Sequence, residues 1–178
     1  MTFDPTAHCP ADVVARAAKV KLACFDVDGT LTDGRLLLDS DGREYKAFHA
    51  RDGQGLALLR RAGIAVAFVT ARPGAATTRR ALELGAELHA EVGDKLACVR
   101  ALAQARGLEL DAVAFMGDDL ADITVMGAAG LAAAPIDAHP WALQHAHWSS
   151  KARGGQGAAR ELCDLLLAAQ GKLAALLP

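Results

Sequence analysis

The strongest structural signal in this chain is the segment Lys21-Leu22-Ala23-Cys24-Phe25-Asp26-Val27-Asp28-Gly29-Thr30. Its apolar first half predicts a buried strand, and its second half carries two aspartates separated by one residue. Alternate side chains of an extended chain point to the same side, so we expect Asp26 and Asp28 to project together from the carboxyl end of the strand. Open α/β sheets bind their ligands at that edge. Gly29 allows a tight turn close to a ligand, and Thr30 adds a hydroxyl group.

The composition is that of a globular protein with one domain. Of the 178 residues, 52% are hydrophobic, so we expect residues 1–178 to form a single domain around a sizeable core. The net charge of −2 gives no indication of a nucleic-acid or membrane partner. No apolar run suits a membrane span or the core of a secretion signal, so we expect a cytoplasmic protein. The cysteines are spaced neither as a zinc site nor as a redox pair; they are Cys9, Cys24, Cys98 and Cys163.

Strand-like and helix-like segments alternate along the chain, which is typical of a mainly parallel sheet flanked by helices. After an N-terminal extension (1–20), we expect strands at 21–25, 64–69 and 112–116, with weaker ones around Leu88 and Leu131. Helices are expected from Pro73 to Leu84, at 53–61 and 94–106, briefly after Asp119, and from Gly157 onward. The glycine-rich segment 151–157 predicts a flexible hinge before the last helix.

Residues 36–48 predict a β-hairpin that turns at residues 39–42. Its strands carry Leu36, Leu38, Tyr45 and Phe48, which is apolar for an isolated ribbon. A two-stranded hairpin alone is marginally stable in water, so we expect other subunits to cover it. Residues 170–178 form a leucine-rich C-terminal tail that we expect to dock over a neighbouring subunit's site.

Three further points place polar groups after predicted strands or at helix starts. The hydroxyl of Thr70 is suited to bind a phosphate oxygen next to a helix N-terminus. Lys95 opposes the dipole of its helix, which indicates a counter-anion. Gly117-Asp118-Asp119, with Asp122 three residues later, offers the oxygen ligands that Mg²⁺ prefers. Taken singly, each point has a simpler explanation as a helix cap or a solvated side chain.

Together these motifs make a complete set for phosphoryl transfer, and the chain resembles the haloacid dehalogenase-like superfamily of phosphatases in all four motifs and in their order. The resemblance covers residues 21–169. It implies a Rossmann-like α/β fold with a central, mainly parallel sheet flanked by helices. The intervals between the motifs are too short for a separate cap domain, so we expect an uncapped domain with a protruding hairpin.

Three longer segments are similar to those of 3-deoxy-D-manno-octulosonate 8-phosphate (Kdo-8-phosphate) phosphatases. They are Asp-Val-Asp-Gly-Thr-Leu-Thr-Asp-Gly (26–34), Phe-His-Ala-Arg-Asp-Gly-Gln-Gly (48–55) and Arg-Gly-Gly-Gln-Gly-Ala-Ala-Arg-Glu (153–161). The chain departs from that pattern at Thr30, where the family often has Val, and at His49, where it often has Asn. The resemblance implies Mg²⁺-dependent hydrolysis of Kdo-8-phosphate in lipopolysaccharide precursor synthesis, by a homotetramer in which each hairpin caps a neighbour's site.

The same resemblance assigns roles to individual residues. Asp26 is the expected nucleophile, and Asp28 the general acid and base. Thr70 and Lys95 are expected to hold the transferring phosphoryl group. The expected metal ligands are Asp26, the backbone carbonyl of Asp28, and Asp118, with Asp119 orienting Lys95 or a metal-bound water. The expected substrate-binding residues are Asp28, His49, Arg51, Asp52, Gly53, Arg72, Arg80 and Lys95.

Other functions remain open at this point. The same chemistry serves other sugar-acid phosphates, such as a nonulosonate 9-phosphate. A non-catalytic accessory domain of a sugar-nucleotide pathway would have the same fold, although loss of Asp26, Asp28 or Lys95 would then be expected. A response-regulator receiver also phosphorylates an aspartate after a strand, but it lacks the Asp-x-Asp-Gly-Thr pair.

Overall fold

Strand β1 (Leu22–Phe25), which directly precedes Asp26, lies in the middle of a six-stranded parallel sheet. The computed structural model describes residues 4–176. The strand order is β5-β4-β1-β6-β7-β8, and every neighbouring pair is parallel. The other five strands are β4 (Ala65–Val69), β5 (Glu87–His89), β6 (Val113–Met116), β7 (Leu131–Ala134) and β8 (Trp148–Ser149). The predicted α/β class is confirmed.

Side chains of β1 alternate between two separate cores, one on each face of the sheet. Ala23 and Phe25 belong to one core, whereas Leu22 and Cys24 belong to the other, and all four are fully buried. A parallel strand covered on both faces must be apolar at every position. The continuous apolar run from Leu22 to Phe25 therefore reflects its central place in the sheet.

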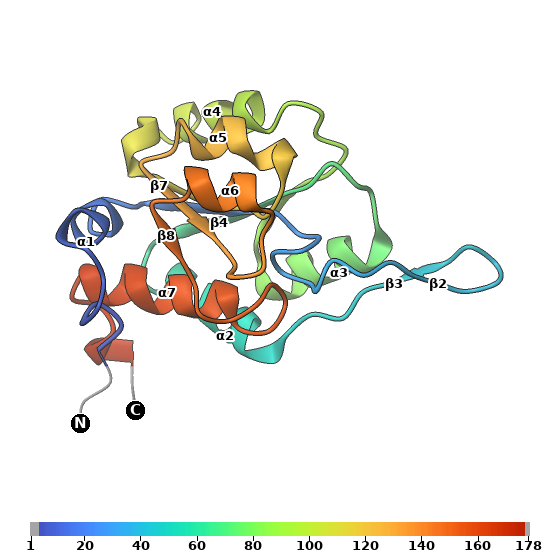
Figure 1. Cartoon of the computed structure of the whole chain (residues 1–178), viewed down its shortest axis with the longest axis horizontal. Helices are drawn as coiled ribbons and strands as arrows, with labels where there is room; N and C mark the ends of the chain where they lie inside the picture. The colour runs from blue at the N-terminus through green and yellow to red at the C-terminus, as the bar shows by residue number, and fades with distance from the viewer. Residues whose placement is uncertain (1–3, 177–178) are drawn as a thin grey trace.

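Helices cover both faces of the sheet, so the molecule has three layers (Figure 1). One face carries α1 (Ala11–Ala17), α2 (Ala50–Arg61), α3 (Ala75–Leu84) and α7 (Ala158–Ala169). The other face carries α4 (Lys95–Gln104), α5 (Ile123–Met126) and α6 (Pro140–His145). Short 3₁₀ turns lie at Leu110–Ala112, Leu120–Asp122 (η2) and Ala174–Leu176 (η3).

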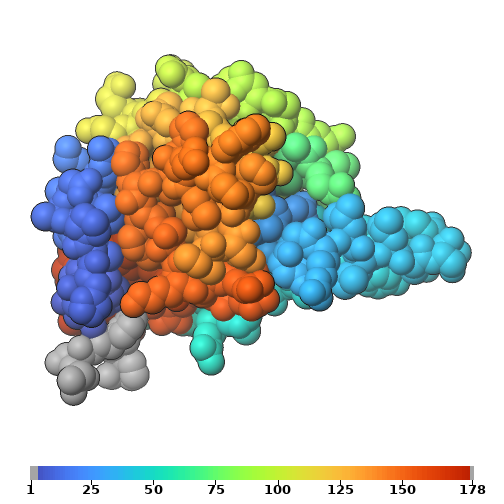
Figure 2. Space-filling view, viewed as in Figure 1, coloured from blue at the N-terminus to red at the C-terminus, as the bar shows by residue number. Residues whose placement is uncertain are grey.

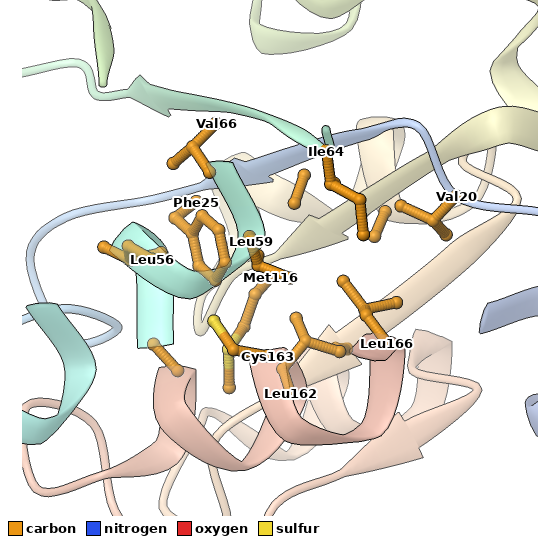
Figure 3. Close-up of a cluster of buried hydrophobic side chains, with 14 of the residues drawn as sticks. Val20, Phe25, Leu56, Leu59, Ile64, Val66, Met116, Leu162, Cys163 and Leu166 are labelled. Atoms are coloured by element: carbon orange, nitrogen blue, oxygen red, sulfur yellow. The ribbon is translucent and has the colours of Figure 1, made fainter. Parts of the chain in front are cut away.

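The larger core lies between the sheet and the helix pair α2 and α7 (Figure 3). Phe25 of β1 and Met116 of β6 point from the sheet toward Leu59 of α2 and Leu162 of α7. All four side chains are at most 2% exposed. This packing fixes α7, and with it the glycine-rich segment that precedes α7, relative to β1.

The predicted hairpin is present and protrudes from the body of the molecule (Figures 1 and 2). Its strands β2 (Leu37–Leu38) and β3 (Glu44–Tyr45) are antiparallel and shorter than the prediction of 36–38 and 44–48. The turn is fixed by Asp39, whose Oδ1 accepts hydrogen bonds from the N–H groups of Asp41 and Arg43. Large apolar side chains are half or more exposed on this ribbon; they are Leu36, Leu37, Leu38 and Tyr45.

The prediction missed three short elements: α1 within the N-terminal extension, α6 and β8. Each has two to seven residues, too few for a hydrophobic period to show. In α1 the buried contacts come from Val13 and Ala17. These elements extend the two cores without changing the topology.

The prediction of a flexible hinge at 151–157 was wrong. Gly154 is buried, and its N–H donates to Asp137 Oδ1 at 2.9 Å. The N–H of Gly155 donates to the carbonyl of Thr30 at 3.0 Å. The glycines in this segment serve close backbone packing, which a composition-based reading takes for flexibility.

The C-terminal tail turns back onto its own chain. Lys172 Nζ donates to the carbonyl of Ala62 at 3.0 Å, and Leu173 and Leu176 pack against the larger core. These contacts lie within one chain, so the expected docking of the tail over a neighbouring subunit's site stays a prediction. Leu177 and Pro178 lie outside the described residues. Between residues 4 and 176, no helix is both long and apolar enough to cross a bilayer.

Candidate active site

The predicted site residues meet at the carboxyl edge of the sheet, because parallel strands all end there. Asp26 follows β1, Thr70 follows β4 and Asp118 lies two positions after β6. Lys95 is the first residue of α4. No extra domain separates these motifs in the described chain: a hairpin, α2 and β4 fill the interval from Asp28 to Thr70.

Asp26 is buried and held by Lys95. The Nζ of Lys95 lies 2.6 Å from Asp26 Oδ1 and 2.6 Å from Asp122 Oδ1. The alternation along β1 directs position 26 toward the face that carries α4, where Lys95 begins the helix. Each of the three residues is at most 6% exposed, so this cluster forms a fixed, desolvated charge network.

The carboxylate that accompanies Lys95 belongs to Asp122, whereas the prediction gave Asp119 as one candidate. Asp119 caps η2 and accepts a hydrogen bond from the N–H of Leu120 at 2.8 Å. Asp122 Oδ2 accepts from the N–H groups of Asp118 and Asp119 at 2.9 and 3.2 Å. Asp122 thus ties Lys95 to the loop that carries Asp118, while the other suggested role for Asp119, at a metal-bound water, stays a prediction.

The electrostatics of this cluster favour a cation. Burial, together with the charge of Asp122, raises the pKa of Asp26 to about 6 in spite of Lys95. Burial and the charges of Asp26 and Asp122 raise the pKa of Asp118 to about 8. Burial alone would lower the pKa of Lys95, but the charges of Asp26 and Asp122 outweigh burial, and the pKa is raised. Three carboxylates and one ammonium group leave an excess of negative charge.

Oxygen atoms of Asp26, Asp118 and Asp122 lie within 4.8 Å of one another. Carboxylate oxygens are the ligands that Mg²⁺ takes in proteins, so the donor set fits that ion. Asp122 already accepts from Lys95 and from two backbone N–H groups, which leaves Asp26 and Asp118 as the carboxylates best placed for a metal. The expected ligation by the backbone carbonyl of Asp28 stays a prediction.

Asp28 has different neighbours from Asp26, because β1 ends at Phe25 and the chain turns at residues 27–30. The strict alternation of a strand therefore does not extend to position 28. The Asp28 carboxylate forms an ion pair with Lys46 of the hairpin, and Arg72 Nε lies 3.8 Å from its Oδ2. Glu44 completes the group, 3.4 Å from Lys46 Nζ and 3.3 Å from Arg72 Nη2.

Sequence reasoning missed Lys46 and Glu44. A signal was available, since Glu44 and Lys46 flank Tyr45, the last residue of β3. In an extended chain their side chains lie on the side of the ribbon opposite to that of Tyr45. The Lys46 side chain is only 3% exposed, an unusual burial for lysine. Beside it lies a groove of about 360 Å³ between the hairpin and the start of α3, bounded in part by Gly74.

Thr70 is buried at the end of β4, and its Oγ1 accepts a hydrogen bond from the N–H of Arg72 at 3.2 Å. The hydroxyl hydrogen remains available to a ligand. The Thr70 backbone is held on both sides, by His89 and by Val92. This fixed position suits the predicted contact with a phosphoryl group, which stays a prediction.

The remaining predicted substrate residues lie on or against α2. His49 precedes the helix, and its buried Nδ1 has no hydrogen-bond partner among the described residues. Gly53 makes room for Arg80, since a Cβ at position 53 would lie 2.1 Å from Arg80 Nη2. The Arg80 guanidinium also lies over the Phe48 ring, 5.9 Å from its centroid. The space between these residues is small, about 10 Å³.

In the single chain, Asp52 contacts the start of α7, and Arg51 is exposed. The Asp52 carboxylate accepts hydrogen bonds from the N–H groups of Gly157 and Arg160, at 3.2 and 2.7 Å. It therefore caps the N-terminus of α7, whose own cap residue is a glycine. Arg51 is exposed, and no hydrogen bond of its side chain occurs in the described chain. Their predicted roles in substrate binding remain predictions.

The chain is similar to known phosphatases over most of its length. Residues 86–162 match the model of the haloacid dehalogenase-like hydrolases. The 3-deoxy-D-manno-octulosonate 8-phosphate phosphatase KdsC of Yersinia pestis is 42% identical over 91% of this chain and 87% of that protein. Its counterpart in Escherichia coli K12 is 41% identical over 92% of this chain and 87% of that protein.

Solved structures are also similar to this chain over most of its length. A hypothetical protein of Xanthomonas campestris superposes with a TM-score of 0.97 at 52% identity, over 99% of this chain and 97% of that one. The Moraxella catarrhalis 3-deoxy-D-manno-octulosonate 8-phosphate phosphatase, solved with magnesium, phosphate and KDO, has a TM-score of 0.90 at 36% identity, over 92% and 95% of the two chains. With the fold, the four motifs and these identities in agreement, the chain belongs to the 3-deoxy-D-manno-octulosonate 8-phosphate phosphatases, a family of haloacid dehalogenase-like hydrolases.

Proposed function

We propose that this protein hydrolyses Kdo-8-phosphate to Kdo and inorganic phosphate, with Mg²⁺ as cofactor, in the synthesis of lipopolysaccharide precursors. The observation that carries the proposal is the buried cluster in which Lys95 holds Asp26 at 2.6 Å with Asp118 alongside. An accessory domain without chemistry would have no use for a desolvated carboxylate of raised pKa at this edge. Family membership supplies the choice of substrate.

The reaction is proposed to take place in two displacements. An Asp26 oxygen bonds to phosphorus as the bond from phosphorus to the sugar oxygen breaks, and Asp28 gives its proton to that oxygen. Water then attacks phosphorus and gives a proton to Asp28, and the bond from phosphorus to Asp26 breaks. Phosphate leaves, and both carboxylates return to their starting states.

The other residues of the site hold charge in place during both steps. Lys95 fixes Asp26 with the free oxygen available to phosphorus and faces the charge of the phosphoryl group. Thr70 offers its hydroxyl hydrogen to a phosphoryl oxygen. Mg²⁺, when bound by Asp26 and Asp118, neutralises the carboxylates and the transferring group.

The cationic groups around Asp28 suit a sugar acid. Lys46 lines the groove beside the hairpin, Arg72 pairs with Glu44 of the same groove, and both cations are paired with carboxylates in the single chain. A substrate carboxylate can replace these partners, since guanidinium binds such a group in two places. We propose that Arg72 and Arg80, with His49 and Arg51, recognise the acid and hydroxyl groups of Kdo.

A phosphate-release assay tests this function. We expect Kdo-8-phosphate to be cleaved with a kcat/KM at least about a hundredfold above that of a nonulosonate 9-phosphate or an aryl phosphate. Chelation of Mg²⁺ should stop the reaction and its return should restore it. Preference for the nine-carbon substrate would favour the alternative phosphatase. Failure to release phosphate from any substrate would favour the accessory domain.

The exposed hairpin supports a proposal for assembly. Its four apolar side chains are between 50% and 62% exposed in the single chain. We propose a homotetramer in which the hairpins pack together and each open site is covered by a neighbouring subunit.

The cysteines at positions 9, 24, 98 and 163 are all free thiols, which suits the reducing cytoplasm that we propose as the location.

A further inference from the structure

Asp118, the proposed metal ligand of the β6 end, is contacted at both carboxylate oxygens by the turn that follows β1. Thr30 Oγ1 donates to Asp118 Oδ1 at 3.2 Å. On the other side, a Cβ placed on Gly29 would lie only 2.1 Å from Asp118 Oδ2. Gly29 has φ of +91°, so its backbone suits glycine for this reason too. The position of the Asp118 carboxylate therefore depends on the position of this turn.

The glycine-rich segment packs against this turn and holds it in position. A Cβ on Gly154 would lie 1.8 Å from the carbonyl oxygen of Gly29. The N–H of Gly155 donates to the carbonyl of Thr30 at 3.0 Å. The backbones of Gly29 and Thr30, the two residues that contact Asp118, thus pack against residues 154 and 155.

The segment is in turn fixed by the loop that follows β7. Asp137 Oδ1 accepts the N–H of Gly154 at 2.9 Å, and the N–H of Ile136 donates to the carbonyl of Ala152 at 3.3 Å. Two residues after Asp137, the N–H of His139 donates to the backbone carbonyl of Asp118 at 2.8 Å. The contacts form a closed ring that starts and ends at Asp118.

We propose that Asp137 is a positioning residue for the magnesium site. Its carboxylate holds Gly154 and Gly155 against Gly29 and Thr30, and these two residues fix the carboxylate of Asp118. The inference rests on the metal site of the proposed function, but it concerns binding of the ion rather than turnover. Asp137 itself is exposed, so its replacement removes one hydrogen bond without opening a core.

Calorimetric titration of the metal-free protein with MgCl₂ tests the proposal. Asp137→Ala should raise the Kd for Mg²⁺ about fivefold, the effect of one lost side-chain to backbone hydrogen bond. Asp137→Asn keeps Oδ1 as an acceptor and should bind within about twofold of the wild type. At saturating Mg²⁺ the KM of Asp137→Ala for substrate should be unchanged.

Glu161→Ala is the matched control. Glu161 Oε2 accepts the N–H of Lys151 at 2.7 Å, so this variant loses the same kind of bond at the other end of the segment. It should bind Mg²⁺ as the wild type does. Gly154→Ala should weaken binding more than Asp137→Ala, because its methyl group displaces Gly29.

Two results would overturn the proposal. One is a wild-type Kd for Mg²⁺ in Asp137→Ala. The other is an equal loss in Asp137→Asn and Asp137→Ala, which would mean that the charge of Asp137 acts and its hydrogen bond does not. Because no substrate enters the titration, an error in the proposed substrate would leave these outcomes unchanged.

Discussion

At the scale of single residues, the site is a set of carboxylates whose charges are set by their neighbours. Asp26 and Asp28 are two positions apart, yet one is held by Lys95 and the other by Lys46. The difference suits the two roles proposed for them. A nucleophile needs a fixed oxygen, whereas a general acid and base must gain and lose a proton during each cycle.

The contact between Lys46 and Asp28 predicts an effect on catalysis. Lys46→Ala removes a buried cation from the proposed acid and base, and we expect kcat/KM for the sugar phosphate to fall about tenfold or more. Arg61→Ala is the control, since Arg61 is exposed at the C-terminal end of α2, outside the hairpin and its groove. Equal activity of the two variants in the phosphate-release assay would exclude a role for Lys46.

The raised pKa of Asp118 predicts how stability depends on pH. Without metal the folded protein keeps this proton up to about pH 8, while the unfolded chain releases it near its ordinary value of 3.8. Between pH 3.8 and about pH 8 the folded state therefore binds more protons than the unfolded chain. The contribution of Asp118 to stability is greatest below this range and decreases as the pH rises through it. Asp118→Asn removes this term, and its free energy of unfolding should fall less steeply with pH than that of the wild type.

Urea denaturation in the presence of a chelator, at about pH 5 and about pH 8, measures the difference. Asp111→Asn, a change at an exposed acid, is the control and should follow the wild type. Parallel stability curves for Asp118→Asn and the wild type would show that Asp118 is not destabilised by its ionised neighbours.

At the scale of elements, Asp52 joins two helices that carry much of the larger core. It lies in the first turn of α2 and caps α7 through two backbone N–H groups. Asp52→Ala leaves these donors without a partner in a buried place, and we expect a loss of about 2 kcal/mol in the free energy of unfolding. Asp52→Asn, which keeps one acceptor oxygen, should lose less. A change below about 0.5 kcal/mol for Asp52→Ala in urea denaturation would contradict the capping role.

The longer elements could be predicted from the sequence because their apolar periods are clear and glycine or proline marks their ends. The end of α3 at Gly85, which has φ of +60°, is one case. The order of the motifs along the strands also placed Asp26, Thr70, Lys95 and Asp118 at one edge.

What could not be predicted depends on side-chain contacts between distant segments. The pairing of Lys46 with Asp28 follows from how the hairpin leaves the sheet, which no local pattern encodes. The choice of Asp122 over Asp119 arises because the chain forms a 3₁₀ turn there, in which Asp119 serves as the cap. The glycines at 154 and 155 were misread because close packing and flexibility select the same residue.

At the scale of the whole molecule, an uncapped site and an apolar hairpin both point to assembly. Replacing Leu36 and Leu38 by aspartate should break the proposed tetramer, because buried charges without partners are costly at an interface. Activity should fall further for Kdo-8-phosphate than for a small aryl phosphate. Leu82→Asp is the control, since Leu82 is 71% exposed on α3, outside the hairpin. A fully active monomer of the wild type in light scattering at assay concentration would refute the assembly.

The proposed reaction depends on the attack of Asp26 on the phosphorus of Kdo-8-phosphate, and the bond that this step forms can be detected. Metal-loaded protein is mixed with Kdo-8-phosphate and quenched in acid within the first turnover, and the peptide that contains Asp26 is examined by mass spectrometry. We predict one phosphoryl group on Asp26 in the wild type, and neither this group nor turnover above about a hundredth of the wild-type rate in a folded Asp26→Asn variant. Release of Kdo in the first turnover with an unmodified Asp26, or with the phosphoryl group on another residue, would exclude Asp26 as the nucleophile.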